Sequence, residues 1–120
     1  MSGHFVGNLD VRLVKDQKEP LWMLLSVFGW MDDQHGLIQA EVGFLTDLLS
    51  IPRIIGVYDE LGDRARMAAA IHDWTYDKKL FPREVCDQIL REMLKVDGYT
   101  NIQAEEAYLA VREFGGSHWK

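Results

Sequence analysis

The sequence contains very little cysteine, since Cys86 is the only one in 120 residues. Because a disulfide joins two cysteines, no intramolecular disulfide can form, and a metal site built from several thiolates is excluded as well. A chain without disulfides suits a reducing compartment. We therefore expect the protein to be made in a bacterial-type cytoplasm.

Long apolar runs are also missing. The longest one, from Leu21 to Met31, is far shorter than the ~20 residues that a membrane-spanning helix needs. The first residues lack the basic flank and the apolar block of a signal peptide. We expect neither a transmembrane segment nor a cleaved signal peptide.

Basic residues are a minority among the charged ones, with 13 Lys and Arg against 19 Asp and Glu and a formal net charge of −6. Nucleic acid is not an expected partner, because binding to phosphates requires a basic surface. Apolar residues, in contrast, are plentiful: 48% of the chain is hydrophobic and 11% is aromatic, which is enough for a packed core. At this length one core organises the chain, which predicts a single domain over residues 1–120.

The N-terminal part carries the patterns of β-strands. Apolar and polar residues alternate from Asn8 to Lys15, which is typical of a half-buried strand. The apolar stretch from Leu21 to Met31 is followed by the turn residues 32–36 and by an extended pattern over 37–42. These patterns predict a strand and a β-hairpin in a sheet part that spans about 8–47.

In the second half of the chain the residue pattern has the periodicity of helices. Good helix formers run from Arg64 to about Lys79, with Asp63 in the position to cap this first helix. Pro82 and Gly98 suit the start and the end of a second helix.

A third helix is predicted by the spacing of Thr100 and Gln103, which is that of a capping box, and it should end at Gly115. The helical part therefore spans about 63–115. Strands followed by helices predict an α+β fold, in which a small antiparallel N-terminal β-sheet packs with three C-terminal helices.

The most informative polar residues lie on the first two predicted helices. His72 and Tyr76 are four residues apart and share one helix face, whereas Asp73 is rotated by about 100° from His72. Asp87 borders the buried stripe of the second helix, and the short connection makes the two helices antiparallel neighbours. We therefore expect Asp87 within hydrogen-bond reach of the His72 ring, with Tyr76 nearby.

Such a cluster has a chemical and a structural interpretation. A carboxylate that accepts a hydrogen bond from one imidazole nitrogen fixes the tautomer, so that the other nitrogen can take a proton from water. Asp73, turned away from this pair, can bind a hard cation such as calcium. Buried histidines and carboxylates also satisfy each other in cores that perform no chemistry. The pattern leaves both interpretations open, with His72, Asp87 and Tyr76 as the catalytic candidates.

Five motifs follow one another between about Leu37 and Trp119: Gly43–Asp47, Ser50–Arg53, His72–Tyr76, Arg83 with Asp87, and Ala110–Gly115. In these motifs the chain resembles a family of small phage and prophage proteins that is described as a domain of unknown function. The resemblance implies a genomic setting in tailed phages but no particular reaction. It makes the bacterial host cytoplasm the place of synthesis and the virion a further location.

A second resemblance is local and covers the two helices. The pattern His72-Asp73-x-x-Tyr76, with Asp87 on the antiparallel next helix, is similar to the catalytic helix pair of secreted phospholipase A2 enzymes. The resemblance implies that His72 is the base, Asp87 its partner, Tyr76 a hydrogen-bond donor to Asp87, and Asp73 the calcium ligand. Those enzymes are rich in disulfides and add carbonyl ligands from a glycine-rich loop, whereas the segment directly before this helix pair has only two glycines, at positions 56 and 62.

Residues near the end of the predicted sheet are further candidates. Asp47 can supply a second ligand to the same metal, or it can form a turn, as Thr46 and Ser50 also can. Arg53 and Arg83 can bind an anion, or they can tie the helices to the sheet.

Other chemistries have less support in the sequence. Zinc favours clusters of His, Cys and carboxylates, and only His72 has neighbours of this kind. Nucleophilic catalysis by Ser50 or Cys86 lacks a base nearby in the sequence. Apart from calcium, no cofactor is expected.

Three functions remain open at this point. The first is a metal-assisted hydrolase of an ester or phospholipid, which a phage would use against host envelope lipid. The second is a non-enzymatic virion or assembly protein, associated with the tail, whose partners are other virion proteins. The third, an acidic inhibitor of a host protein, follows only from the small size and the negative charge. The sequence identifies neither the substrate nor the oligomeric state.

Overall fold

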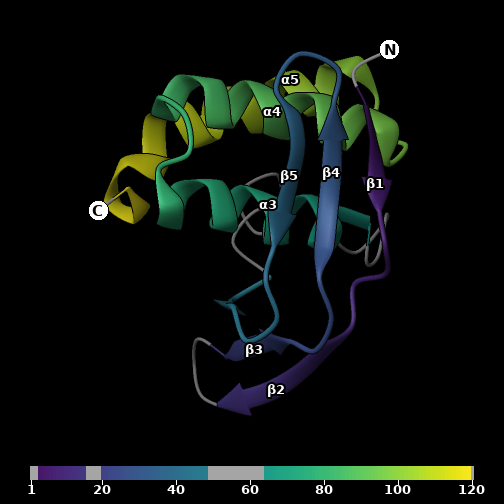
Figure 1. Cartoon of the computed structure of the whole chain (residues 1–120). Coiled ribbons are helices and arrows are strands. Elements are labelled where there is room, and N and C mark those ends of the chain that lie inside the picture. Colours follow the sequence, from purple (N-terminus) through teal and green to yellow (C-terminus); the bar gives the residue numbers. More distant parts are fainter. Residues whose placement is uncertain (1–2, 16–19, 49–63, 120) are drawn as a thin grey trace.

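The computed structural model describes residues 3–15, 20–48 and 64–119. In this part of the chain the strands come first and the helices follow (Figure 1). The strands are β1 (Gly3–Val6), β2 (Val11–Lys15), β3 (Leu21–Leu24), β4 (Phe28–Asp32), β5 (Gly36–Ala40) and β6 (Leu45–Thr46). The helices are α3 (Arg64–Lys78), α4 (Arg83–Val96) and α5 (Asn101–Phe114), followed by the short 3₁₀ helix η1 (Gly115–His118). The predicted α+β class is confirmed.

The strands form two antiparallel sheets of three strands each, β1-β4-β5 and β2-β3-β6, where the sequence predicted one. The two sheets share one long ribbon, because β1 pairs with β4 and β2 pairs with β3. Between the sheets the pairing continues through the backbone N–H of Leu25, which donates to the carbonyl of Asp10 at 2.8 Å. The predicted strand from Leu21 to Met31 is therefore divided into β3 and β4. The sequence analysis missed β1, which is four residues long and offers too short a run for an alternating pattern.

The hairpin between β4 and β5 forms at the predicted turn, where Asp32 pairs with Gly36. Gly36 has a φ of 80°, a backbone conformation that glycine adopts without steric cost. This hairpin turns the side chains of Phe28, Trp30 and Ile38 inward, and each of them is at most 2% exposed. The first sheet therefore supplies one wall of the core.

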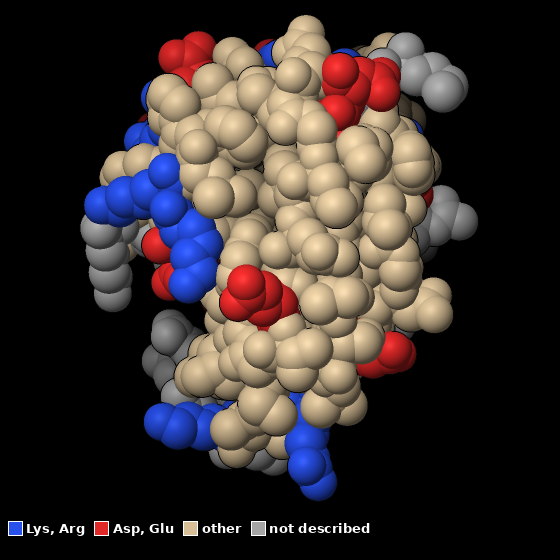
Figure 2. Space-filling view, viewed as in Figure 1, with Lys and Arg blue, Asp and Glu red and all other residues tan. Residues whose placement is uncertain are grey.

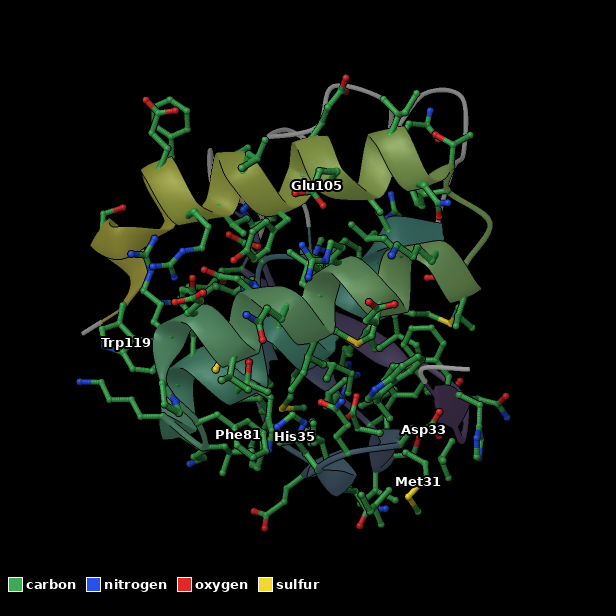
Figure 3. The ribbon with its side chains drawn as sticks, turned by 90° about the horizontal axis from the view of Figure 1, so that it is seen from above. Met31, Asp33, His35, Phe81, Glu105 and Trp119 are labelled. Carbon is green, nitrogen blue, oxygen red and sulfur yellow. The ribbon has the colours of Figure 1, made fainter. Side chains whose placement is uncertain are left out.

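Helix α3 is the centre of the molecule. Its alanines at 65, 68, 69 and 70 and its Ile71 are fully buried, and the small side chains allow neighbouring elements to approach closely. The first sheet lies against α3 and α4, and α5 covers α4 on the other side (Figures 1 and 3). The result is a layer of strands, a layer formed by α3 and α4, and an outer helix α5.

The face of the first sheet that points away from the helices carries few charged side chains (Figure 2). One row across this face consists of His4, Met31 and Leu37, which the strand register places side by side. Leu37 is 49% exposed. The helix layer thus covers only one side of the sheet.

Two helix termini have the capping residues that the sequence predicted. Thr100 and Gln103 form both hydrogen bonds of the capping box, at 3.1 and 3.0 Å, and Gly98 after α4 has a φ of 105°. The proposed cap Asp63 lies outside the described residues. None of the helices in the described part has the length and apolar character needed to span a membrane.

Candidate functional site

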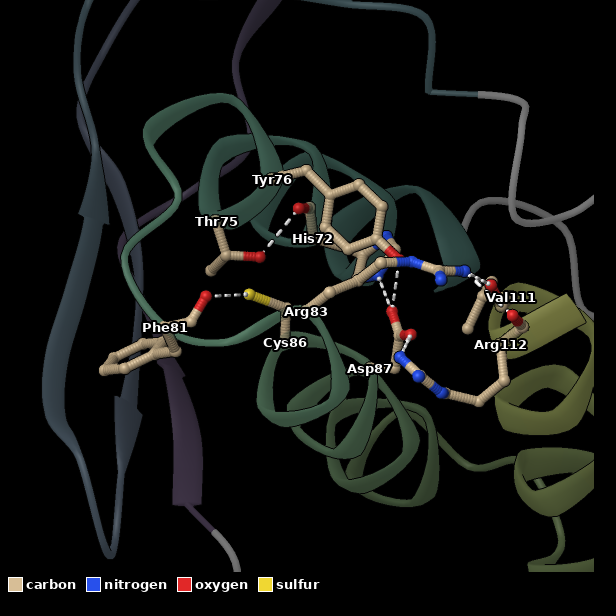
Figure 4. A network of polar contacts seen from close by, with 9 residues as sticks. All are labelled: His72, Thr75, Tyr76, Phe81, Arg83, Cys86, Asp87, Val111 and Arg112. Atoms are coloured by element: carbon tan, nitrogen blue, oxygen red, sulfur yellow. Dashed lines mark hydrogen bonds and ion pairs between the residues drawn. The ribbon is translucent and has the colours of Figure 1, made fainter. Parts of the chain in front are cut away.

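The polar cluster predicted from the sequence lies where α3, α4 and α5 meet (Figure 4). A short connection makes the chain fold back from α3 to α4. It is closed by a hydrogen bond of 3.2 Å from the backbone N–H of Leu80 to the carbonyl of Thr75, and Lys79 adopts a φ of 48°. The turn brings Asp87, on the second turn of α4, against the last turns of α3.

Asp87 is the centre of the cluster and is fully buried. Its Oδ1 accepts hydrogen bonds from Nε2 of His72 at 2.8 Å and from the hydroxyl of Tyr76 at 2.6 Å. Its Oδ2 accepts a hydrogen bond from Nη1 of Arg112, on α5, at 2.9 Å. The predicted hydrogen bond between His72 and Asp87 is therefore present, and one carboxylate connects all three helices.

Arg83 adds a second connection between the same helices. Its Nε donates to the Tyr76 hydroxyl at 3.2 Å, and its Nη2 donates to the carbonyls of Val111 and Arg112 at 2.6 and 2.9 Å. The C-terminal end of α5 is thereby held against the start of α4. Arg83 ties the helices to one another, whereas the sequence analysis considered a tie to the sheet.

Gly115 lets the end of α5 approach this cluster closely. A Cβ atom at this position would lie 3.0 Å from the Tyr76 hydroxyl and 3.3 Å from Nη2 of Arg83. Any larger residue would therefore push against two groups that take part in the network. Beyond it, the ring of Trp119 packs edge-on against Tyr76, with 5.1 Å between centroids.

The surroundings shift the acidity of two groups in the cluster. Burial opposes the ionisation of Asp87, but the hydrogen bonds from His72, Tyr76 and Arg112 outweigh it and lower the pKa of this carboxyl below its ordinary value. Burial, together with the neighbouring carboxylate of Asp87, raises the pKa of the Tyr76 hydroxyl. At neutral pH Asp87 is therefore an ionised acceptor, and Tyr76 is a neutral donor.

Asp73 points away from this cluster, as the helical spacing predicted. Its Oδ2 accepts a hydrogen bond from the hydroxyl of Thr46, on β6, and the backbone of Asp47 donates to it as well. Partial burial and the negative charge of Asp47 raise the pKa of Asp73 to about 7. Two carboxylates from distant parts of the sequence thus lie close together at the junction of β6 and α3.

This acidic pair is a candidate site for a metal cation. Calcium takes six to eight oxygen ligands, of which Asp73 and Asp47 can supply the carboxylates and water the remainder. Among the described residues, no group of three or more His, Cys, Asp and Glu gathers at one point. The donors fit a weakly bound hard cation and do not fit zinc.

The structure separates the predicted site residues into two groups. His72, Tyr76, Arg83 and Asp87 form the cluster between the helices, and Asp73 with Thr46 and Asp47 forms the acidic pair and its support. Ser50 and Arg53 lie outside the described residues.

Arg112 is the member of the cluster that the sequence analysis did not propose. It belongs to the Ala110–Gly115 motif, and it follows Val111 on the buried stripe of α5. Because Arg112 is next to this stripe, the sequence pattern could have indicated that its side chain borders the core. Its partner is 25 residues away in the sequence, which no local pattern indicates.

We expect His72→Ala to destabilise the fold whether or not the protein is an enzyme. The substitution removes one of the two hydrogen bonds that the buried Oδ1 of Asp87 accepts, which costs about 1–3 kcal/mol. Urea unfolding measures this as a lower midpoint. His35→Ala is the matched control, because the His35 pair with Asp32 is partly exposed and such pairs contribute about 0–1 kcal/mol. Equal midpoints for natural protein and His72→Ala would contradict the account.

Asp87 also makes stability depend on acid. Since its pKa is lower in the folded state than in the unfolded chain, where it is about 3.9, its contribution is complete above that pH. The contribution is lost as the pH falls below about 3.9 toward the lower folded-state pKa. We expect Asp87→Asn to be less stable at neutral pH and to lose less further free energy of unfolding in acid. The measurement is urea unfolding of the natural protein and Asp87→Asn at a series of pH values. If the free energy of unfolding of both proteins falls by the same amount as the pH is lowered, the prediction is contradicted.

The comparison with protein families finds a family of unknown function, and to this extent it agrees with the first resemblance. Residues 22–111, three quarters of the chain, match the family described as "Protein of unknown function (DUF1353)". The matched range begins in β3 and includes the whole of α3 and α4, and therefore His72, Tyr76, Arg83 and Asp87. No curated protein and no solved structure matches the chain. The chain belongs to the DUF1353 family of proteins of unknown function.

Proposed function

We propose that this protein is a hydrolase of ester bonds, with phospholipid as the substrate class, in which His72 acts as the general base. The observation that supports this most is the pair formed by His72 and Asp87, whose oxygen also receives the Tyr76 hydroxyl. The arrangement agrees with the roles that the resemblance to the phospholipase A2 helix pair implies. A setting in phages would make host envelope lipid the target.

The chemistry follows from the ionisation of Asp87. A carboxylate can only accept hydrogen bonds, so it holds the His72 tautomer in which Nε2 carries the proton, and the ring stays fixed on α3. Nδ1 is then the nitrogen that takes a proton from water as the water oxygen attacks the ester carbonyl carbon. The bond to the alcohol oxygen breaks, and His72 returns the proton to it. The products are a fatty acid and a lysophospholipid.

Asp73 and Asp47 are the residues that would hold calcium beside this base. Bound there, calcium would supply the positive charge that stabilises the developing oxyanion. Burial and the charge of Asp47 together raise the pKa of Asp73 to about 7, and a cation would relieve the repulsion between the two carboxylates. Thr46 orients the Asp73 carboxylate through its hydroxyl.

A second candidate function has an observation in its favour. His72 is 4% exposed and Asp87 is fully buried, and the arginines at 83 and 112 occupy the same network. These contacts would serve equally to fix three helices in a non-enzymatic virion or assembly protein. The same polar cluster would then be purely structural.

Calcium binding separates the two candidates. If Asp73 holds calcium, the ion should raise the melting temperature of the natural protein by mass action, and Asp73→Asn should abolish that rise while leaving the metal-free fold intact. The titration should extend to millimolar calcium, because a site with few protein ligands binds at about 10⁻³ M. Glu106→Gln is the matched control, since it removes the same charge from an exposed position on α5.

The reaction itself is tested on phospholipid vesicles with calcium present. We expect release of fatty acid by the natural protein and by Glu106→Gln, and loss of about 10²-fold or more in His72→Gln, since general-base catalysis contributes roughly that much. Circular dichroism of His72→Gln checks that the protein is folded. Absence of both a calcium-dependent melting shift and fatty acid release would reject the hydrolase and leave the assembly role.

A further inference from the structure

A second histidine–carboxylate pair lies at the tip of the β4–β5 hairpin, far along the sequence from the first. Nδ1 of His35 is 2.8 Å from Oδ2 of Asp32, and the His35 side chain is 28% exposed. The pair lines a cavity of about 750 Å³ between the hairpin turn, the start of β1 and helix α4. Cavities that hold small molecules have volumes of about 300–1,000 Å³.

The His35 ring is held in place more firmly than a turn residue requires. Asp32 is 7% exposed, and besides the ring it accepts the backbone N–H groups of Gln34 and His35 and the indole N–H of Trp30, at 3.0–3.1 Å. On its other side the ring packs on Phe81, with 4.8 Å between centroids (Figure 3). The backbone bonds alone would close the turn, so the additional contacts serve to orient the imidazole beside the cavity.

The orientation determines what the ring offers to a ligand. The hydrogen bonds to Asp32 from Trp30, His35 and the turn backbone outweigh its burial and lower its pKa, so that it is an ionised acceptor. Nδ1 of His35 therefore carries the proton of the neutral ring, and Nε2 presents a lone pair. Nε2 has no hydrogen-bond partner among the described residues, and it acts as an acceptor.

The charged groups of α4 around the cavity form ion pairs, whereas Asp33 at the hairpin turn forms none within the described part of the chain. Asp33 is exposed, and no described residue pairs with its carboxylate. The cation of Lys95 lies 3.6 Å from Glu92, and that of Arg91 bonds to Glu105 at 3.1 Å and stacks over Tyr108. The hairpin side of the cavity thus offers two acceptors that no described residue uses, the carboxylate of Asp33 and Nε2 of His35.

We propose that this cavity binds a small organic cation rich in hydrogen-bond donors, of the aliphatic amine class, through Nε2 of His35 and the carboxylate of Asp33. An ammonium group donates to both acceptors and neutralises the charge of Asp33. Ile89 and Val96, on α4, line the same cavity and contact the methylene groups of such a ligand. The site is independent of the hydrolase proposed at His72.

Spermidine is a suitable probe, followed by ¹H–¹⁵N NMR of the natural protein. We expect saturable shifts of the His35 ring signals and of the amides of residues 32–35 and 88–96, and none with glutarate or glycerol at the same concentration. The ring spectrum should also report a proton on Nδ1. Shifts confined to other parts of the chain, or a proton on Nε2, would overturn the proposal.

Three variants separate this site from general attraction of a polyamine to a chain of net charge −6. Asp33→Asn and His35→Gln should each weaken spermidine binding about tenfold, which corresponds to ~1.4 kcal/mol. Glu106→Gln removes the same charge from an exposed position of α5 that does not line the cavity, and it should leave the affinity unchanged. Equal weakening by all three variants, or no effect of the first two, would reject the site. Thermal melts check that each variant is folded.

Discussion

A buried carboxylate must be paired, and in this protein the pairing of Asp87 is the constraint on which the arrangement of the helices depends. Removing one partner from a buried ion pair typically costs 3–5 kcal/mol, because an uncompensated charge remains. Asp87 takes its partners from α3 and from α5, while it lies on α4 itself. None of the three helices can therefore shift without leaving the charge unsatisfied. The small alanines of α3 and the missing side chain of Gly115 provide the close approach that the hydrogen bonds require.

The same chemical pair occurs a second time in a different setting. His72 is enclosed between helices, whereas His35 lies on a hairpin turn beside a cavity. In both pairs an ionised carboxylate selects the tautomer and holds the ring, but the first carboxylate also holds helices together and the second also closes a turn. The buried pair is therefore closely connected to stability, and the exposed pair is more accessible to a ligand. Substitutions at the two histidines distinguish these roles.

The sequence predicted those features that depend on neighbours along the chain. The spacing of His72 and Tyr76, with a short connection to α4, was sufficient to predict their contact with Asp87, and the turn residues 32–36 predicted the hairpin. The features that it did not predict depend on long-range packing. The contact of Arg112 with Asp87 requires the position of α5. Thr46 and Asp47 were placed at the Asp73 site only as one of two alternatives, because the hydrogen bond from Thr46 to Asp73 joins residues 27 apart. Asp32 and His35 were interpreted only as turn formers, because the side chain of Trp30 and the ring of Phe81 complete that arrangement from outside the turn.

The central claim is that the imidazole of His72 and the carboxylate of Asp87 are energetically coupled in the folded protein. A double-mutant cycle of His72→Ala, Asp87→Ala and the double variant, measured by urea unfolding at neutral pH, tests it most directly. The account predicts a coupling free energy of about 1–3 kcal/mol, with the double variant less destabilised than the sum of the single ones. Free energies that add to within about 0.3–0.5 kcal/mol would show that the two groups act independently and would contradict the account.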